Sequence, residues 1–252
     1  MKLGAQLFSI RTECTTPEAL YSSMKKIKDI GYEIVQVSGV CSIEAERLLS
    51  YSEEFELPIT CTHRPYVEIM EKCAEVIEYH KVIKCPVIGL GSMPKDMRGS
   101  REGLYAFIDA MKKPLKMITD AGLTFAYHNH GFEFEKFDGK YAYDIIIDEL
   151  PELHFIHDVY WSKHAGADPL HYVNLLGNTG RMTNIHFKDM KSEPQGDMCP
   201  CGEAVIDFTA LADACARQGI ENVLVEQDNA PTLGDVFEQM KTSYENLKHI
   251  VK

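Results

Sequence analysis

Histidines and carboxylates end three successive apolar runs in the second half of the chain. These runs close with His157-Asp158, Ile185-His186 and Val225-Glu226. Such groups are costly to bury unless something binds them, and a divalent metal ion is the simplest common partner. Imidazole nitrogen with carboxylate oxygen suits Mn, Fe, Co or Zn better than Ca. One such residue alone is more often a solvated strand end or a helix cap. Three in succession favour a metal site formed by Asp158, His186 and Glu226.

Two earlier apolar runs also end in histidine, at His63 and at Tyr127-His128-Asn129-His130. Side chains alternate between the two faces of a strand, so His128 and His130 share one face and Asn129 the other. We expect at least one of these two histidines to be functional.

The same alternation places Lys188 on the face of His186 and turns His157 away from the face of Asp158. Lys188 either contacts a substrate oxygen or forms an ion pair with Asp158 or Glu226.

These residues need a scaffold that brings strand ends together, and the apolar pattern provides one. Short apolar runs alternate with amphipathic stretches along the whole chain, which is typical of βαβ units and a parallel sheet. The expected strands are Leu3–Phe8, Ile34–Ser38, Pro58–His63, Val87–Gly91, Leu123–His128, His154–Asp158, Thr183–Lys188 and Val223–Glu226. The expected helices are Ala19–Ile30, one carrying Ala45 to Leu49, Tyr66–Lys84, Glu102–Asp120, Tyr141–Leu150, Pro169–Leu176, Phe208–Gln218 and Leu233–Val251.

Local signals place several helix boundaries. Thr16 is a suitable N-cap before Pro17, and Ser42 could cap the next helix. Pro114 should kink the long helix that contains it. Three glycines follow expected helices, where left-handed caps are needed: Gly31, Gly122 and Gly219. Three histidines fall on helix patterns and are expected at the surface: His80, His171 and His249.

Eight strands alternating with eight helices predict a single (β/α)8 TIM barrel spanning residues 1–252. An open doubly wound sheet is the alternative, but no Gly-x-Gly-x-x-Gly opens a helix. Active sites of such barrels lie at the carboxyl ends of the strands, where the polar residues gather here. The segment Lys191–Glu203, rich in Pro, Gly and acidic residues, is expected to be a loop over one mouth of the barrel.

Composition excludes several classes of protein. The 252 residues carry 26 Lys and Arg against 38 Asp and Glu, a net charge of −12, which argues against a nucleic-acid partner. No stretch approaches the roughly 18 apolar residues of a membrane span, and the N-terminus lacks a secretory apolar core. We expect a cytoplasmic protein whose eight cysteines are reduced thiols. Cys199-Pro200-Cys201 has neither the gap nor the second pair of a zinc site.

The chain resembles the sugar phosphate isomerase/epimerase family, a group of xylose isomerase-like TIM barrels. The matching segments keep their order along nearly the whole chain. They are Leu3–Arg11, Tyr127–Phe134, Asp158–Trp161 with Gly166–Pro169, His186–Asp189, Gly202–Phe208 and Val225–Asp228.

The resemblance implies one divalent metal ion, either Mn, Co, Zn or Mg, held by carboxylates of the fifth, sixth and eighth strands and a histidine of the seventh. Asp158, His186 and Glu226 match three of these positions. At the fifth-strand position this chain has Tyr127 or His128 instead of glutamate. Glu133 is the expected fourth ligand, and His128 is the alternative.

The resemblance also implies an isomerase or epimerase that removes a proton next to the carbonyl of a sugar or keto-sugar, through an enediolate. With no glutamate at the fifth-strand tip, His130 becomes the expected base, together with Glu226 and Lys188 as catalytic residues. His63, His128, Trp161 and Lys188 are the expected substrate contacts, although Trp161 could equally be packing. No Gly-rich loop or Arg cluster indicates a phosphate site, which favours a non-phosphorylated sugar or cyclitol. A homo-oligomer is possible.

Three other functions are also considered for this sequence. A dehydratase or lyase acting on an inosose or 3-keto sugar would use the same metal site. A barrel that only binds a sugar would lack catalysis. A DNA-repair endonuclease on this fold would need a basic groove, which the net charge opposes.

Overall fold

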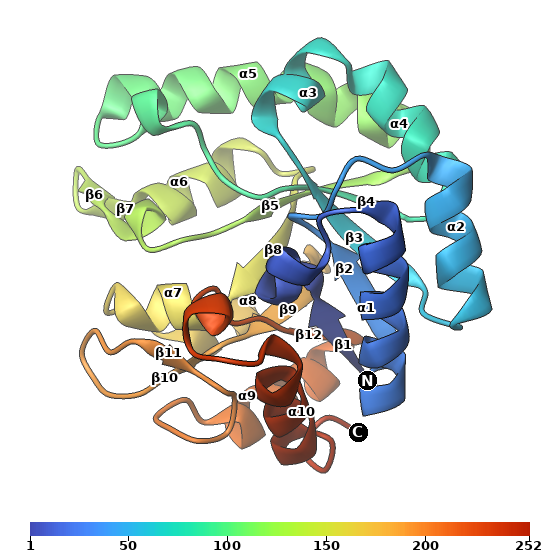
Figure 1. The fold of residues 1–252 in the computed structure, drawn as a ribbon. Coiled ribbons are helices and arrows are strands. Elements are labelled where there is room, and N and C mark those ends of the chain that lie inside the picture. Colours follow the sequence, from blue (N-terminus) through green and yellow to red (C-terminus); the bar gives the residue numbers. More distant parts are fainter.

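A computed structural model describes residues 1–252, and eight parallel strands close into a barrel at its centre. Figure 1 shows the strands crossing the middle of the molecule inside a ring of helices. The closed barrel confirms the predicted fold class. In spatial order its strands are β1 (Lys2–Gln6), β12 (Asn222–Val225), β9 (Met182–Phe187), β8 (His154–Asp158), β5 (Thr124–His128), β4 (Val87–Leu90), β3 (Ile59–Arg64) and β2 (Ile34–Val37).

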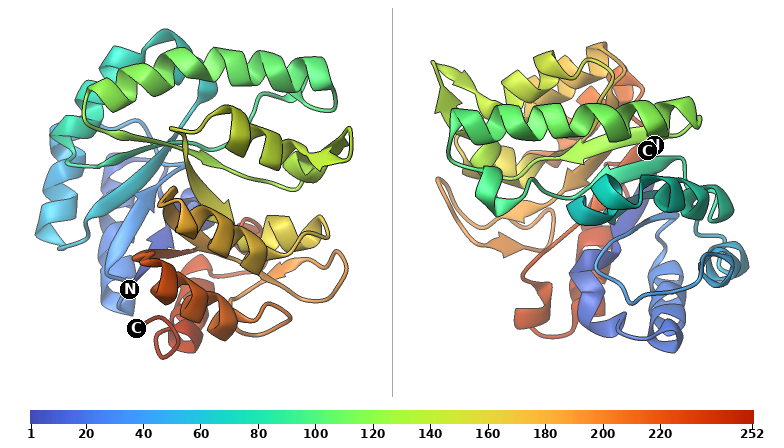
Figure 2. Two further views of the ribbon diagram at one scale, coloured as in Figure 1. Left: turned by 180° about the vertical axis from the view of Figure 1, so that it is seen from behind. Right: turned by 90° about the horizontal axis from the view of Figure 1, so that it is seen from above.

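The helices follow the strands in sequence and cover the outside of the barrel, as the two further views in Figure 2 show. Short 3-10 segments lie in the loops at Leu7–Glu13, Lys95–Met97, Phe132–Phe134 and Ala230–Thr232. The α-helices are α1 (Pro17–Ile30), α2 (Ala45–Glu54), α3 (Tyr66–Glu71), α4 (Cys73–Val82), α5 (Arg101–Asp120), α6 (Ala142–Glu149), α7 (Val159–His164), α8 (Pro169–Asn178), α9 (Phe208–Gln218) and α10 (Val236–Leu247).

The alternation of side chains divides the core into two parts. A large apolar layer lies between the strands and the helices, and it holds most of the buried Leu, Ile, Val and Phe. A separate small cluster contains Cys61, Val87, Ala126 and Ile156 from four adjacent strands. Ala126 and Ile156 stand two residues before the last residues of β5 and β8, so those last residues share their face. The strands therefore carry polar side chains at their carboxyl ends, above this cluster.

Several helix boundaries agree with the sequence signals. The side chain of Thr16 accepts a hydrogen bond from the Ala19 amide and caps α1. The three expected glycine caps all have positive φ, at Gly31, Gly122 and Gly219. Pro114 lies inside α5, which continues through it to Asp120.

Other expectations about the helices were wrong. The helix expected over Tyr66–Lys84 is two helices, α3 and α4, separated at Lys72, whose φ of −129° is not helical. No Gly or Pro marks this break. It allows Tyr66 to face the mouth of the barrel while α4 packs against β4. Ser42 does not cap α2, which begins at Ala45 after an extended Glu44. The last helix is shorter than expected and is capped by Asp235.

His80 was expected at the surface and is instead fully buried. Its Nδ1 lies 2.7 Å from the Val76 carbonyl oxygen and its Nε2 lies 2.7 Å from the Thr62 hydroxyl. Both ring nitrogens thus have partners, and burial lowers the pKa of His80 to about 4. The residue joins α4 to β3.

The segment Lys191–Glu203 is a loop, and strand pairing and hydrogen bonds to Asp189 hold it in place. It contains β11 (Met198–Cys199), which pairs with β10 (Asp189–Met190). The carboxylate of Asp189 is fully buried and accepts hydrogen bonds from four backbone amides, those of Met190, Gly202, Ala204 and Ile206.

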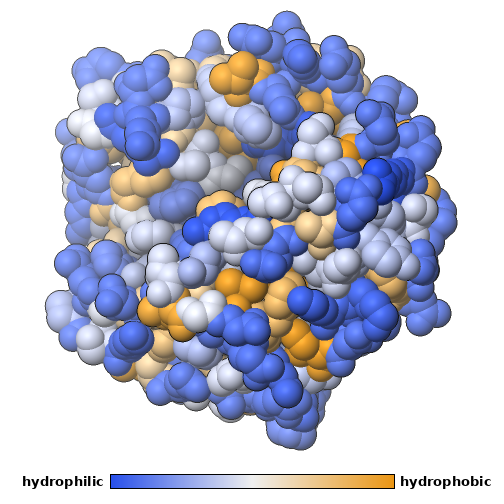
Figure 3. Space-filling view, viewed as in Figure 1, coloured by the Kyte–Doolittle hydropathy of each residue, from blue (hydrophilic) through white to orange (hydrophobic).

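The outer surface of the molecule is mostly polar. Figure 3 shows hydrophilic residues over most of one face, with small scattered hydrophobic groups. No helix is both long enough and apolar enough to cross a membrane. All eight cysteines are free thiols. The two ends of the chain meet, with the Met1 amino group 2.6 Å from the backbone oxygen of Lys252.

Candidate metal centre

Four buried side chains meet at the carboxyl ends of neighbouring strands: His128, Asp158, His186 and Glu226. Each offers one ligand atom, and the four atoms lie within 4.8 Å of one another. These atoms are His128 Nε2, Asp158 Oδ2, His186 Nδ1 and Glu226 Oε2, and none has a hydrogen-bond partner of good geometry. Buried polar atoms nearly always have partners. The set of two imidazoles and two carboxylates therefore fits a divalent transition metal ion.

The barrel positions these side chains through its strand register. Asp158 ends β8 and pairs with His186 of β9, whose next neighbour in register is Leu224 of β12. Asp158 also caps α7, since its Oδ1 accepts a hydrogen bond from the Trp161 amide at 2.9 Å. Its second oxygen, Oδ2, is left facing the other three residues.

Hydrogen bonds to the far side of each imidazole fix which nitrogen faces the cluster. His186 Nε2 lies 2.8 Å from the side-chain oxygen of Gln36 and donates to it. His128 Nδ1 lies 3.2 Å from the carbonyl oxygen of Gly91 and donates in the same way. The remaining nitrogen of each ring then points toward the cluster, where His186 Nδ1 lies 2.9 Å from Glu226 Oε2, and it offers a lone pair when the ring is neutral. Such outer partners commonly orient histidines that bind metal ions.

Lys188 forms ion pairs with the carboxylates of Asp158 and Glu226. Its Nζ lies 2.9 Å from Asp158 Oδ2, 2.9 Å from Glu226 Oε2 and 3.1 Å from the Asp228 carboxylate. The ion pair with Asp158 and Glu226 was one of the two alternatives expected for this lysine. Three buried or half-buried carboxylates thus face one ammonium group. A divalent cation would balance the remaining negative charge, and a carboxylate oxygen has lone pairs for both neighbours.

The charges of Asp158, Glu226 and Lys188 stabilise one another. Although burial would raise the pKa of Asp158 and of Glu226, Lys188 and the neighbouring imidazoles hold both well below their usual values. Burial would lower the pKa of Lys188, but the three carboxylates keep it well above its usual value. Burial would also lower the pKa of His186, which Glu226 and Asp158 raise instead.

Glu133, the expected fourth ligand, does not lie among these four residues. Its Oε1 lies 2.5 Å from the Tyr127 hydroxyl, and its Oε2 accepts a hydrogen bond from the His130 amide at 2.8 Å. The carboxylate is fully buried, which raises its pKa to about 7. Both oxygens hold the loop after β5 in place. His128, the alternative, is the residue that the structure places beside Asp158, His186 and Glu226.

His130 stands beside the cluster. Its ring lies 4.8 Å from that of His128, stacks on Phe132 at 5.5 Å and is 5.6 Å from Trp161. Burial, with the neighbouring His128 and Lys188, lowers the pKa of His130 to about 2. The imidazole is therefore neutral at physiological pH. Trp161 packs against this ring, and the Lys188 ammonium lies 5.7 Å from the Trp161 ring centre.

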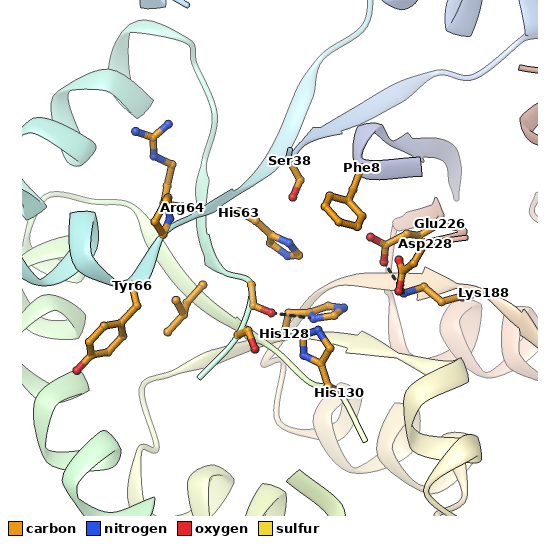
Figure 4. A pocket seen from close by; sticks show the side chains of 14 residues that line it. Phe8, Ser38, His63, Arg64, Tyr66, His128, His130, Lys188, Glu226 and Asp228 are labelled. Atoms are coloured by element: carbon orange, nitrogen blue, oxygen red, sulfur yellow. Dashed lines mark hydrogen bonds and ion pairs between the residues drawn. The ribbon is translucent and has the colours of Figure 1, made fainter. Parts of the chain in front are cut away.

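A cavity of about 330 Å³ opens above the cluster, and Figure 4 shows the side chains that line it. His63, His128, His130, Lys188 and Glu226 all border it, so the structure brings most of the expected catalytic and substrate-contacting residues to one space. Trp161 is not among its lining residues. The His63 ring lies 5.0 Å from His128 and 5.8 Å from His186.

Sequence reasoning missed three polar residues of this site. Gln36 orients His186, Asn129 forms two hydrogen bonds with the backbone of Asp158, and Asp228 borders the cavity beside Lys188. Gln36 sits in an apolar run, Ile34–Val37, and a buried glutamine within a strand was the available signal for it. Asp228 shares the parity of Glu226 and could have been found by the alternation rule.

Comparisons with known proteins show the fold. No family model matches the sequence, and no curated protein matches it. Among solved structures, the chain is similar to a sugar phosphate isomerase/epimerase from Parabacteroides distasonis, with a TM-score of 0.84 and 18% identity over 100% of this chain and 96% of that one.

Two further solved structures resemble the chain. The probable 3-DHS dehydratase AsbF of Bacillus anthracis, involved in petrobactin synthesis, has a TM-score of 0.78 and 14% identity over 98% of this chain and 99% of that one. An IolI protein with a bound zinc atom has a TM-score of 0.78 and 14% identity over 100% of this chain and 98% of that one. These likenesses support a xylose isomerase-like TIM barrel.

Proposed function

We propose that the protein is a metal-dependent isomerase or epimerase that removes a proton next to the carbonyl of a non-phosphorylated sugar or keto-sugar, through an enediolate. The observation that carries this proposal is the cluster of four buried ligand atoms, two from imidazoles and two from carboxylates, within 4.8 Å of one another at the floor of the cavity. The similar fold of a sugar phosphate isomerase/epimerase supports it.

In this proposal His128, Asp158, His186 and Glu226 hold one divalent ion such as Mn, Co, Zn or Mg. When bound, the ion supplies Lewis-acid polarisation of substrate oxygens. Gln36 and the Gly91 carbonyl keep the two imidazoles in the tautomers that this role requires. Lys188 donates hydrogen bonds at the edge of the cavity and stabilises negative charge that develops on a substrate oxygen.

We assign the removal of the proton to His130. The ring borders the cavity, is neutral, and packs against Phe132 and Trp161. A neutral imidazole accepts a proton without first losing one. Glu226 is the second residue in the proton transfer. Its carboxylate is ionised because its contacts with Lys188 and His186 lower its pKa.

A dehydratase or lyase acting on an inosose or 3-keto sugar is the second candidate. Asp228 favours it, because its carboxyl borders the cavity and burial raises its pKa to about 6. An acid of that strength is able to protonate a leaving hydroxyl group near neutral pH. The dehydratase among the similar structures also supports it. Mass spectrometry of the product separates the two candidates, since only the dehydratase product has lost water.

The proposal is tested with the purified protein and its Glu226→Gln variant. We expect near-stoichiometric binding of Mn, Co or Zn by the native protein, measured by metal analysis and titration. In the variant, the dissociation constant should rise at least as much as the roughly 10–100-fold that follows loss of an outer-sphere partner. Glu203→Gln, at an exposed position in the same half of the chain, is the control and should bind metal normally.

The same samples are then tested for exchange of the substrate α-proton with deuterated water by NMR, using a panel of keto-sugars, aldo-sugars and inososes with added Mn. Exchange by the native protein but not by Glu226→Gln is the expected result. Equal metal binding by the native protein and Glu226→Gln would exclude the proposed centre.

A further inference from the structure

A second polar cavity continues from the first one. It has a volume of about 490 Å³ and lies between the loop after β2 and the start of α3. Ser38, His63, Arg64 and Pro65 line both cavities, so the two are contiguous. The first cavity alone is near the lower end of the roughly 300–1,000 Å³ that small-molecule sites usually have. The site therefore has more room than the space directly above the four-residue cluster.

The walls of the second cavity are preformed. The Tyr79 hydroxyl donates a hydrogen bond to the Ile43 carbonyl at 3.2 Å and ties α4 to the loop after β2. The Cys41 amide donates to the Cys14 carbonyl at 2.8 Å and anchors the same loop to the segment after β1. Because these walls are already ordered, the protein loses little conformational entropy when a ligand binds there.

The charge of the second cavity suits a neutral, hydroxyl-bearing group. Arg64 is the one cationic side chain that lines it, and its guanidinium is already paired with Glu68 at 2.5 Å. An anionic group such as a phosphate would have to compete with Glu68. A hydroxyl both donates and accepts hydrogen bonds, so it complements a guanidinium beside a carboxylate.

Two unpartnered polar atoms mark the junction of the cavities. His63 Nε2 and Arg64 Nε are both buried, and neither has a hydrogen-bond partner. Figure 4 shows the His63 side chain between Arg64 and the group of Lys188 and Glu226. A ligand that extends from the four-residue cluster across the end of β3 would pass these two residues, which line both cavities.

We propose that the second cavity is a subsite for a neutral glycosyl or polyol substituent of the substrate. The sugar ring that reacts lies above His128, Asp158, His186 and Glu226, and the substituent lies between Arg64, Glu68 and Ser42. The proposal rests on the proposed function for the position of the reacting ring. It adds that the substrate is larger than a single ring.

The test measures binding, which requires no turnover. Ligand-observed NMR and titration calorimetry on the Mn-loaded protein compare D-fructose with isomaltulose, which is fructose carrying a glucosyl ring, and D-glucose with cellobiose. We expect the disaccharide of at least one pair to bind about tenfold more tightly, equivalent to roughly 1.4 kcal/mol. Saturation transfer should reach the protons of both rings. Glucose 6-phosphate should bind no more tightly than glucose.

Two serine variants localise the effect. Ser42→Phe fills the second cavity and should remove the preference for the disaccharide, together with saturation transfer to its second ring. Ser50→Phe places the same side chain at an exposed position on α2, outside both cavities, and should keep the native preference. Equal binding of single-ring and two-ring probes, no binding of either, or an unchanged preference in Ser42→Phe would overturn the subsite. Loss of metal binding in Glu226→Gln tests the proposed function separately, since it does not depend on any sugar.

Discussion

Among the side chains at the cavity, we compare His130 and Asp228 as the group that accepts a proton from the substrate. His130 is neutral, but its pKa of about 2 makes it a weak base. A negatively charged group close to the ring would raise that pKa. Asp228 has a pKa of about 6, closer to the value that suits a base near neutral pH, but Lys188 occupies both of its oxygens. We favour His130 because it borders the cavity and is not engaged by Lys188.

His130→Asn should slow exchange of the substrate α-proton by roughly 10²–10⁴-fold, the usual contribution of a general base. Metal affinity should change little, because His130 is not one of the four clustered residues. Exchange is followed by NMR in deuterated buffer. Asp228→Asn is the matched comparison and should retain more of the exchange activity. A larger loss in Asp228→Asn than in His130→Asn would assign the base to Asp228 instead.

Glu133 should make the stability of the protein depend on pH. Burial raises its pKa to about 7 in the folded state, from about 4.5 when unfolded. The folded state therefore binds more protons than the unfolded state between these values, and stability falls as pH rises from about 4.5 to 7. In Glu133→Gln this decline in the unfolding free energy should be shallower by up to about 1.4 kcal/mol per pH unit. Denaturant titrations across this pH range measure it, and parallel pH profiles of the two proteins would contradict the assignment.

At the scale of elements, all eight barrel strands were predicted within one or two residues of their observed ends. The strands are short and apolar on both faces, and the polar residues that end them mark their carboxyl ends. Some helix ends were predicted from a local signal, as with Thr16 before α1, whereas the signal at Ser42 failed because α2 begins later, at Ala45. The break at Lys72 and the burial of His80 could not be predicted, because they depend on packing of α4 against β4 rather than on local sequence.

The residues of the site also divide into those that local sequence predicts and those that depend on long-range packing. Asp158, His186 and Glu226 could be grouped because strand parity and strand order are both written in the sequence. The choice between Glu133 and His128 could not be made, since it depends on the path of the loop after β5. There, Tyr127 and the His130 amide engage the two oxygens of Glu133. The outer partner Gln36 lies about 150 residues from His186, so only the closed barrel brings them together.

The loop Lys191–Glu203 depends on Asp189 for its order. The buried carboxylate holds four backbone amides, and hydrogen bonds to charged groups contribute about 1.5–3 kcal/mol each. Asp189→Asn should therefore increase local opening and raise the rate of trypsin cleavage after the exposed Lys191 by roughly tenfold or more. Asp197→Asn, at an exposed position in the same loop, is the control. Equal cleavage rates in both variants would show that Asp189 does not anchor the loop.

At the scale of the whole molecule, closure of the barrel brings the two ends of the chain together. β1 pairs with β12, and the Met1 amino group contacts the Lys252 backbone oxygen. Figures 1 and 2 show both ends side by side. The polar cluster lies at the carboxyl ends of the strands, whereas Met1 precedes the amino end of β1. The ends are therefore far from the site along the barrel axis.

A circular permutant tests this arrangement. A short Gly-Ser linker joins residues 252 and 1, and new ends are opened between Thr179 and Gly180, before β9 and away from the cluster. Such sites usually tolerate new termini. The permutant should fold and bind Mn with the affinity of the native protein, as measured by circular dichroism and titration. A folded permutant without metal affinity would indicate that the site depends on the original chain ends.

The position of Lys188 beside the four-residue cluster has a consequence for how the proposed site would form. Because Lys188 already lies 2.9 Å from both Asp158 and Glu226, the carboxylates are not left facing each other without a counter-charge. If the four residues hold an ion as proposed, a newly made chain would be able to complete its barrel before the ion binds, with the Lys188 ammonium group balancing part of the negative charge. Under the proposed function, loading would then be a late step, and the ion bound would depend on which metal ions the surroundings supply.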